Sequence, residues 1–255
     1  MCSVYRRVAC IAMLTADRMP YATWRRSVRL FRLFLREQTD PELFYSAFAD
    51  DSVAALAEYV SLAAKTVLDV GGGPGYFASS FRAAGARYIG VELNEPTDLP
   101  AETFAVRGSG TSLPFRTRSV DVAYCSNVLE HVARPWAVAD ELARVTRAGG
   151  TIFVSFTPWL SPWGGHETAP WHYLGGARAR ARYARRHGHE PKNRFGESLF
   201  PHRAADALRW ARACPDVDVV AVYPRYHPAG LRWVTTVPGL REVLTWNLAL
   251  VLRRR

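Results

Sequence analysis

Lysine, cysteine and long apolar segments are all scarce in this chain of 255 residues. Two of its 33 basic residues are lysine and the other 31 are arginine. Its four cysteines form no Cys-x-x-Cys pair, which argues against a disulfide framework or a zinc site of the usual spacing. The longest apolar run, residues 8–14, has seven residues, whereas a membrane-spanning helix needs about 20. The sequence therefore excludes a disulfide scaffold and predicts no spanning helix.

Positive charge is what the chain has in excess. The 33 basic residues exceed the 23 acidic ones by ten, within a composition that is otherwise ordinary for a globular protein. A surface of this sign attracts anionic lipids, nucleic acids or acidic substrates. Because no nucleic-acid recognition motif accompanies the charge, we expect no nucleic-acid partner.

The chain divides into three parts. Residues 1–20 resemble a secretory signal only weakly, so we expect a disordered or misassigned start and a cytoplasmic protein. Residues 21–64 predict helices, the first of which, 24–37, carries arginines along one side. Residues 65–255 predict one large domain. Within it, residues 157–202 are too long for an ordinary connection and are rich in proline and aromatic residues, which indicates an inserted cap.

Strands and helices alternate from residue 65 onward. The patterns predict strands at 66–70, 87–93, 104–107, 119–125, 151–156, 217–223 and 247–252. They predict helices at 41–64 (which Asp50-Asp51 could interrupt), 76–84, 135–147 (closed by Gly149-Gly150), 176–187 and 203–213. This alternation favours an α/β fold with a doubly wound, mostly parallel sheet, whose ligands bind beyond the carboxyl ends of the strands.

The sharpest motif is a glycine-rich loop at residues 67–77, VLDVGGGPGYF, between the first strand and the next helix. Its glycines let the backbone turn tightly and approach a ligand. Glu92 ends the second strand, where a carboxylate can accept hydrogen bonds from both ribose hydroxyls. A dinucleotide loop would have glycine where Tyr76 stands. An NAD-dependent oxidoreductase nevertheless remains one alternative.

The spacing D-x-G-x-G-x-G at residues 69–75 resembles the first motif of the class I S-adenosylmethionine-dependent methyltransferases, in the form common to the type 11 branch. Two further segments resemble the same family: GSGTSLPF at 108–115 and SNVLEHV at 126–132. The whole chain also resembles an uncharacterised actinobacterial group of methyltransferases. The resemblance implies a seven-stranded Rossmann-like sheet and S-adenosylmethionine as cofactor.

The resemblance also implies a set of cofactor-binding residues. They are Asp69, Gly71, Gly72, Gly73, Gly75, Tyr76, Glu92, Leu93, Ser109, Gly110, Thr111 and Asn127. Asp69 would organise the loop and the ammonium group of the cofactor. Ser109 departs from the family, which usually has an acid there for the adenine amino group; a hydroxyl can accept that hydrogen bond only without charge. A catalytically inactive module that binds S-adenosylmethionine or S-adenosylhomocysteine is therefore a second alternative.

Four polar residues are candidates for the acceptor side. His131 follows the fourth strand and could take a proton from a hydroxyl, or it could be a packing residue; its neighbour Glu130 is interpreted as a loop anchor. His166, Glu167 and His172 stand among tryptophans in the insertion, which indicates either an acceptor pocket or a rigid cap. The spacing of these three residues matches no metal motif, so no metal is expected.

Together these residues predict methyl transfer to a small-molecule, lipid-linked or glycan-linked acceptor, with oxygen as the expected methylated atom. The acceptor could be anionic, because the helix at 176–187 is rich in arginine. The arginine-rich helices could also make peripheral contact with a membrane surface.

Overall fold

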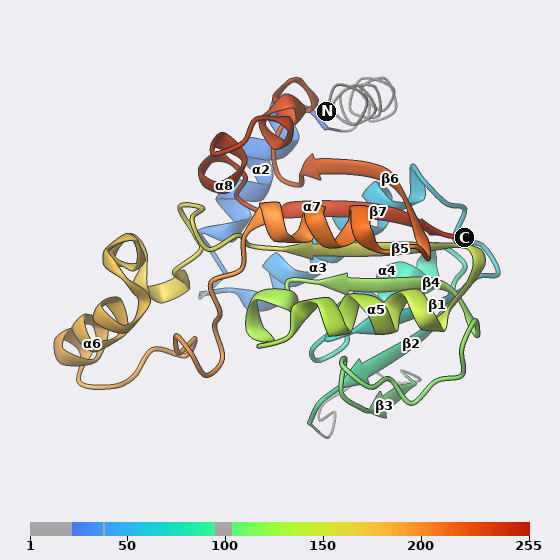
Figure 1. Cartoon of the computed structure of the whole chain (residues 1–255), viewed down its shortest axis with the longest axis horizontal. Coiled ribbons are helices and arrows are strands. Elements are labelled where there is room, and N and C mark those ends of the chain that lie inside the picture. Colours follow the sequence, from blue (N-terminus) through green and yellow to red (C-terminus); the bar gives the residue numbers. More distant parts are fainter. Residues whose placement is uncertain (1–21, 38, 95–103) are drawn as a thin grey trace.

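The computed structural model describes residues 22–37, 39–94 and 104–255 (Figure 1). The expected disordered or misassigned start at residues 1–20 lies outside these residues.

A seven-stranded sheet forms the centre of the molecule. Its strands are β1 (Thr66–Val70), β2 (Arg87–Glu92), β3 (Ala105–Arg107), β4 (Val120–Ser126), β5 (Thr146–Phe156), β6 (Val217–Pro224) and β7 (Leu248–Arg254). They lie in the order β3-β2-β1-β4-β5-β7-β6, and β7 alone among them runs antiparallel to its neighbours. This arrangement confirms the predicted doubly wound, mostly parallel sheet of seven strands.

Helices cover both faces of the sheet. In Figure 1, α5 (Pro135–Val145) and α7 (Ala204–Ala213) lie in front of it, and α3 (Pro41–Ala57) and α4 (Tyr76–Ala83) lie behind it. Adjacent residues of β1 serve the two faces, since Val67 belongs to the apolar cluster under α3 and α4 and Leu68 to the cluster under α5 and α7. A strand buried on both faces is mostly apolar, which fits the short TVLDV run, whose buried Asp69 is the exception.

Helix α3 differs from its prediction because both acids at its centre have partners. The helix passes unbroken through Asp50 and Asp51 and ends at Ala57. Asp50 accepts a hydrogen bond from Ser80 of α4, and Asp51 pairs with Arg26 of α2 (Trp24–Phe34). The two acids therefore fasten α3 to its neighbours instead of interrupting it.

The glycine pair after α5 was wrongly predicted to end that helix. The helix ends at Val145 and β5 begins at once with Thr146, so Gly149 and Gly150 lie inside the strand. Gly149 has a φ of +71°, and the pairing of β4 with β5 shifts register between Val120 and Val122. The two glycines thus belong to an irregular part of β5, where the pairing with β4 shifts register.

Arg225, directly after β6, is a buried cation of which 1% is exposed. Its guanidinium donates hydrogen bonds to four hydroxyls, which belong to Ser52, Tyr124, Ser126 and Ser155. These partners lie on α3, β4 and β5, so one side chain joins three elements. No motif in the sequence pointed to this residue.

The segment 157–202 projects beyond the carboxyl ends of β4 and β5 (Figure 1). It contains two 3₁₀ turns, His166–Thr168 and Trp171–Leu174, followed by α6 (Gly176–His187). Arg180 of α6 forms ion pairs with Glu190 and Glu197, which connect the chain that follows α6 to this helix. The helix α8 (Leu240–Leu244) lies between β6 and β7 in the sequence.

Among the helices of the described residues, none combines the length and apolar character that crossing a membrane requires.

Candidate functional site

The loop between β1 and α4 is tight on the side of the sheet and open on the other. A Cβ added to Gly71 would collide with the side chain of Val128, which follows β4. A Cβ added to Gly73 would meet no atom within 4 Å, and the backbone there has a φ of +61° that side chains rarely adopt. Gly75 forms the N-cap of α4. The loop therefore leaves open space above Gly73 for a ligand.

Glu92, at the end of β2, faces this loop. Its carboxylate accepts a hydrogen bond from the N–H of Gly73, which joins the second strand to the loop after the first. Burial raises the pKa of Glu92, and the Gly73 hydrogen bond partly offsets this increase. Leu93 follows as an exposed residue. An acceptor group beside an open glycine loop fits a nucleoside ligand such as the adenosyl group of S-adenosylmethionine.

Asp69 lies beneath the loop and is 1% exposed. Its carboxylate accepts a hydrogen bond of 2.8 Å from the hydroxyl of Tyr88. Burial raises the pKa of Asp69 to about 7, although the Tyr88 hydrogen bond acts in the opposite direction. A Cβ on Gly72 would come within 2.5 Å of this carboxylate. Asp69 thus supports the loop at Gly72. Tyr76, at the start of α4, stacks on Tyr45 of α3.

The turn that contains Ser109 lies beside Glu92, since the N–H of Gly108 donates to the backbone carbonyl of Glu92. The hydroxyl of Ser109 accepts from the N–H of Thr111 at 3.3 Å and shares a hydrogen bond of 2.9 Å with the hydroxyl of Thr111. Gly110 packs closely on Val70. The predicted residues of the cofactor side therefore meet at the ends of β1, β2 and β3.

Asn127 is the exception among them, because it lies at the end of β4. Its φ is +57°, and its carboxamide oxygen accepts a hydrogen bond of 2.8 Å from Asn247. This contact turns the amide toward the strand β7 and stabilises the turn that leads to His131.

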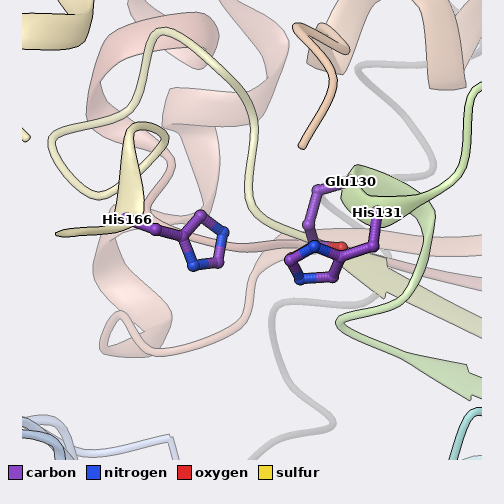
Figure 2. Close-up of side chains that lie close together, drawn as sticks. All are labelled: Glu130, His131 and His166. Atoms are coloured by element: carbon purple, nitrogen blue, oxygen red, sulfur yellow. The ribbon is translucent and has the colours of Figure 1, made fainter. Parts of the chain in front are cut away.

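Two segments far apart in the sequence meet on the acceptor side (Figure 2). His131 stands on the 3₁₀ turn Leu129–His131 after β4, and His166 reaches it from the insertion, with 5.2 Å between the ring centroids. Nδ1 of His131 lies 2.7 Å from the carbonyl oxygen of Ser198. A carbonyl can only accept, so Nδ1 carries the proton and the lone pair of Nε2 is available.

Glu130 completes this cluster. It is 2% exposed, and its Oε1 accepts a hydrogen bond of 3.0 Å from the N–H of Thr157. Its Oε2 has no hydrogen-bond partner among the described residues, and neither does Nε2 of His166. Burial raises the pKa of Glu130. Burial lowers the pKa of His166 to about 3.

One ligand atom from each of Glu130, His131 and His166 lies within 4.8 Å of the others. The interpretation of Glu130 as an anchor accounts for only one of its two oxygens. In the sequence, one feature suggested a further role for Glu130: it directly precedes the candidate base His131 at the end of a parallel strand.

The structure separates the remaining two candidates from this cluster. His172 is buried in the insertion, where its Nε2 donates to the carbonyl of Ser161 at 3.1 Å and its ring packs edge-on against Trp159. Glu167 accepts a hydrogen bond from Asn193.

Glu167 also borders a pocket of about 180 Å³ between the 3₁₀ turns and α6. Further side chains that line this pocket are those of Trp171, Tyr183, Arg182, Arg186 and His187.

Comparison with known proteins agrees with this geometry. Residues 68–154 match a family described as a methyltransferase domain. An uncharacterized methyltransferase of Mycolicibacterium vanbaalenii is 53% identical over 247 residues, which cover 91% of this chain and 95% of that protein. One of Mycobacteroides abscessus is 50% identical over 251 residues, which cover 92% of this chain and 96% of that protein.

Solved structures show the same fold. An S-adenosylmethionine dependent methyltransferase from Mesorhizobium loti is similar with a TM-score of 0.54 and 18% identity, over 80% of this chain and 96% of that one. The chain therefore belongs to the methyltransferase family of the mycobacterial proteins, and it is a class I S-adenosylmethionine-dependent methyltransferase.

Proposed function

We propose that this enzyme methylates a hydroxyl oxygen of a small-molecule, lipid-linked or glycan-linked acceptor. The observation that carries the proposal is the available Nε2 of His131, beside Glu130 and His166 at the carboxyl end of β4. A hydroxyl has to lose its proton as it accepts a methyl group, and a neutral imidazole within reach can take that proton.

One contact connects the turn that carries His131 to the cofactor loop. Gly71 of the cofactor loop packs against Val128, and Val128 begins the turn that leads to Glu130 and His131. When bound, S-adenosylmethionine supplies a methyl group whose bond to sulfur breaks as the new bond to the acceptor oxygen forms. Nε2 of His131 receives the hydroxyl proton. The remaining contribution of the protein is to hold the acceptor in line and to exclude water.

The pocket between the 3₁₀ turns and α6 of the insertion favours an acceptor with a ring or sugar and an anionic group. The guanidinium of Arg182 lies 3.8 Å from the centre of the Trp171 ring, which fixes both groups at the pocket. Arg186 adds a second positive charge, and Glu167 connects the pocket to His166 in the sequence. Aromatic faces stack on sugars and rings, whereas arginine pairs with phosphate or carboxylate.

The surface around α2 supports a peripheral contact with anionic membranes. Trp24 on α2 is 68% exposed, and Trp233 is 50% exposed. Phe31 of α2 packs against Trp246, which places the segment after α8 against this helix. The exposed arginines of α2 flank the apolar side chains. Tryptophan and arginine together are typical of surfaces that lie at the headgroup level of a membrane.

A labelling experiment tests the methylated atom. The purified protein is incubated with S-adenosylmethionine labelled in the methyl group and with lipid and water-soluble fractions of actinobacterial cells. Label in a product that resists alkaline hydrolysis and carries the methyl group on neither nitrogen nor carbon would support an ether. Alkali-labile, nitrogen-bound or carbon-bound label would contradict O-methylation of a hydroxyl. Binding of S-adenosylhomocysteine with no transfer to any fraction would favour the inactive module.

Vesicle sedimentation tests the membrane contact separately. We expect the protein to sediment with vesicles that contain anionic phospholipid and to remain in solution with neutral ones. Replacement of both exposed tryptophans, Trp24→Ala and Trp233→Ala, should weaken this binding. Equal binding to both vesicle types would contradict an electrostatic contribution.

A further inference from the structure

We propose that Glu130, His131 and His166 bind a divalent transition-metal ion, with Zn²⁺ as the best match. Two imidazoles and one carboxylate are the donor set that such ions take in proteins, and three protein ligands leave a coordination position open. The inference uses the proposed function only for the role of the ion, since binding requires no acceptor.

The tautomer of His131 suits this role. Its Nδ1–H donates to the carbonyl oxygen of Ser198 at 2.7 Å, so the lone pair of Nε2 faces away from that contact. Metal-binding histidines typically donate their second N–H to a carbonyl or carboxylate, which fixes both tautomer and ring orientation. This backbone contact comes from the returning end of the insertion, so the folded insertion prepares the ligand.

Glu130 supplies an independent indication. It is 2% exposed, and its Oε2 has no hydrogen-bond partner among the described residues, while Thr157 holds its Oε1. A buried carboxylate oxygen without a partner is costly unless another group compensates its charge. A cation between Glu130 and the two histidines compensates it directly.

His166 approaches the same point from the insertion (Figure 2). Its φ is +48°, which is unusual for a residue with a side chain, and its Nε2 has no hydrogen-bond partner among the described residues. The amide of Asn193 lies 3.5 Å from Nδ1, which is too long to fix the tautomer. Strained residues of this kind occur where a side chain must be held in a functional position.

The separations between the three ligand atoms are close to those found in a metal site. They all lie within 4.8 Å of one another. Ligand atoms of a tetrahedral zinc site are about 3.3 Å apart, given bonds of about 2.0 Å. Binding of an ion would therefore bring the three ligand atoms closer together by up to about 1.5 Å.

The open position gives the ion a role in the proposed reaction. A hydroxyl oxygen of the acceptor that binds there loses its proton more readily, since the ion stabilises the negative oxygen. That proton passes to water, the acceptor oxygen forms its bond to the methyl carbon, and the bond from that carbon to sulfur breaks. In this refinement of the proposed function the ion takes over the activation of the hydroxyl, and Nε2 of His131 holds the ion instead of receiving the proton.

Metal titration of the whole protein tests the site. The protein is treated with EDTA, dialysed and titrated with ZnCl₂ by calorimetry, with MgCl₂ for comparison, and CoCl₂ is added as an optical probe of coordination. We expect one Zn²⁺ per chain, visible absorption bands with Co²⁺, and no comparable binding of Mg²⁺. Glu130→Gln, which preserves the shape of the side chain, and His166→Gln should each weaken Zn²⁺ binding at least tenfold.

His189→Gln is the matched control, because His189 is an exposed histidine just after α6. It should leave the Zn²⁺ affinity unchanged, and thermal unfolding establishes that each variant is folded. Absence of stoichiometric Zn²⁺ binding, or equal binding by the His166 and control variants, would overturn the site. Full methyl transfer by the EDTA-treated enzyme would overturn the role of the ion and leave the proposed function standing. Stoichiometric Zn²⁺ binding by a protein that methylates no hydroxyl in any fraction would leave the metal site standing and overturn the proposed function.

Discussion

The two halves of the proposed active site are built in different ways. The cofactor half uses backbone groups, namely glycine turns and a helix start, together with the carboxylates of Asp69 and Glu92. Except for Asn127, its residues lie between 66 and 113, at the ends of adjacent strands. The acceptor half uses side chains that come from the turn after β4 and from the insertion. The cofactor half can therefore stay constant while changes in the insertion alter the acceptor. The predictions below test whether the two halves are separable.

The largest expected effect is loss of cofactor binding in Gly73→Val. A branched side chain at a φ of +61° would occupy the open space above the loop. We expect no measurable affinity for S-adenosylhomocysteine by calorimetry, with the fold retained by circular dichroism. Gly149→Val is the control, because Gly149 also has a positive φ and open space but lies within β5. Unaltered affinity of Gly73→Val would refute the assignment of the loop.

His131→Gln tests the other half. We expect turnover with an acceptor-containing fraction to fall by about 10²- to 10⁴-fold, the usual contribution of a general acid or base. The affinity for S-adenosylhomocysteine should stay the same, because His131 contacts the insertion and not the cofactor loop. A parallel loss of affinity would show that the two halves are not independent.

Glu92→Ala should weaken the binding of S-adenosylmethionine by about 1.5–3 kcal/mol, the range for hydrogen bonds to a charged group. The substitution removes the proposed ribose partner and the acceptor of the Gly73 N–H. Calorimetry would measure the change, with Glu197→Ala at a surface ion pair as the control. An unchanged affinity would mean that another residue holds the ribose.

Ser109→Asp should have the smallest effect, and it should be a gain. An aspartate would accept the same hydrogen bond from Thr111 and add charge for the adenine amino group. We expect a several-fold higher affinity for S-adenosylhomocysteine, about 1 kcal/mol. A loss of affinity would indicate that the adenine lies against the hydroxyl in a way that leaves no space for a carboxylate.

The same contrast explains how far the sequence alone could lead. The positions of the strands and the glycine loop follow local rules, since apolar runs, glycines and a carboxylate at a strand end each have a direct structural meaning. The end of α5 was missed because the glycines that usually terminate a helix here serve an irregular strand. Local pattern does not distinguish these two uses.

The acceptor cluster depends on contacts that no local pattern contains. Glu130 meets the N–H of Thr157, and His131 meets the carbonyl of Ser198, 67 residues later in the chain. His166 and His172 look alike in the sequence, yet one reaches the cluster and the other is packed against Trp159. Only the path of the insertion separates them.

The buried Arg225 has a consequence for how the family can vary. Its charge cannot be neutralised by loss of a proton, and its two terminal guanidinium nitrogens donate to hydroxyls from α3, β4 and β5. Loss of Arg225 would leave four hydroxyls short of a donor, and loss of a hydroxyl would leave a cation short of an acceptor. We therefore expect Arg225 and its four hydroxyl partners to evolve together, so that homologues either keep all five residues or replace all five.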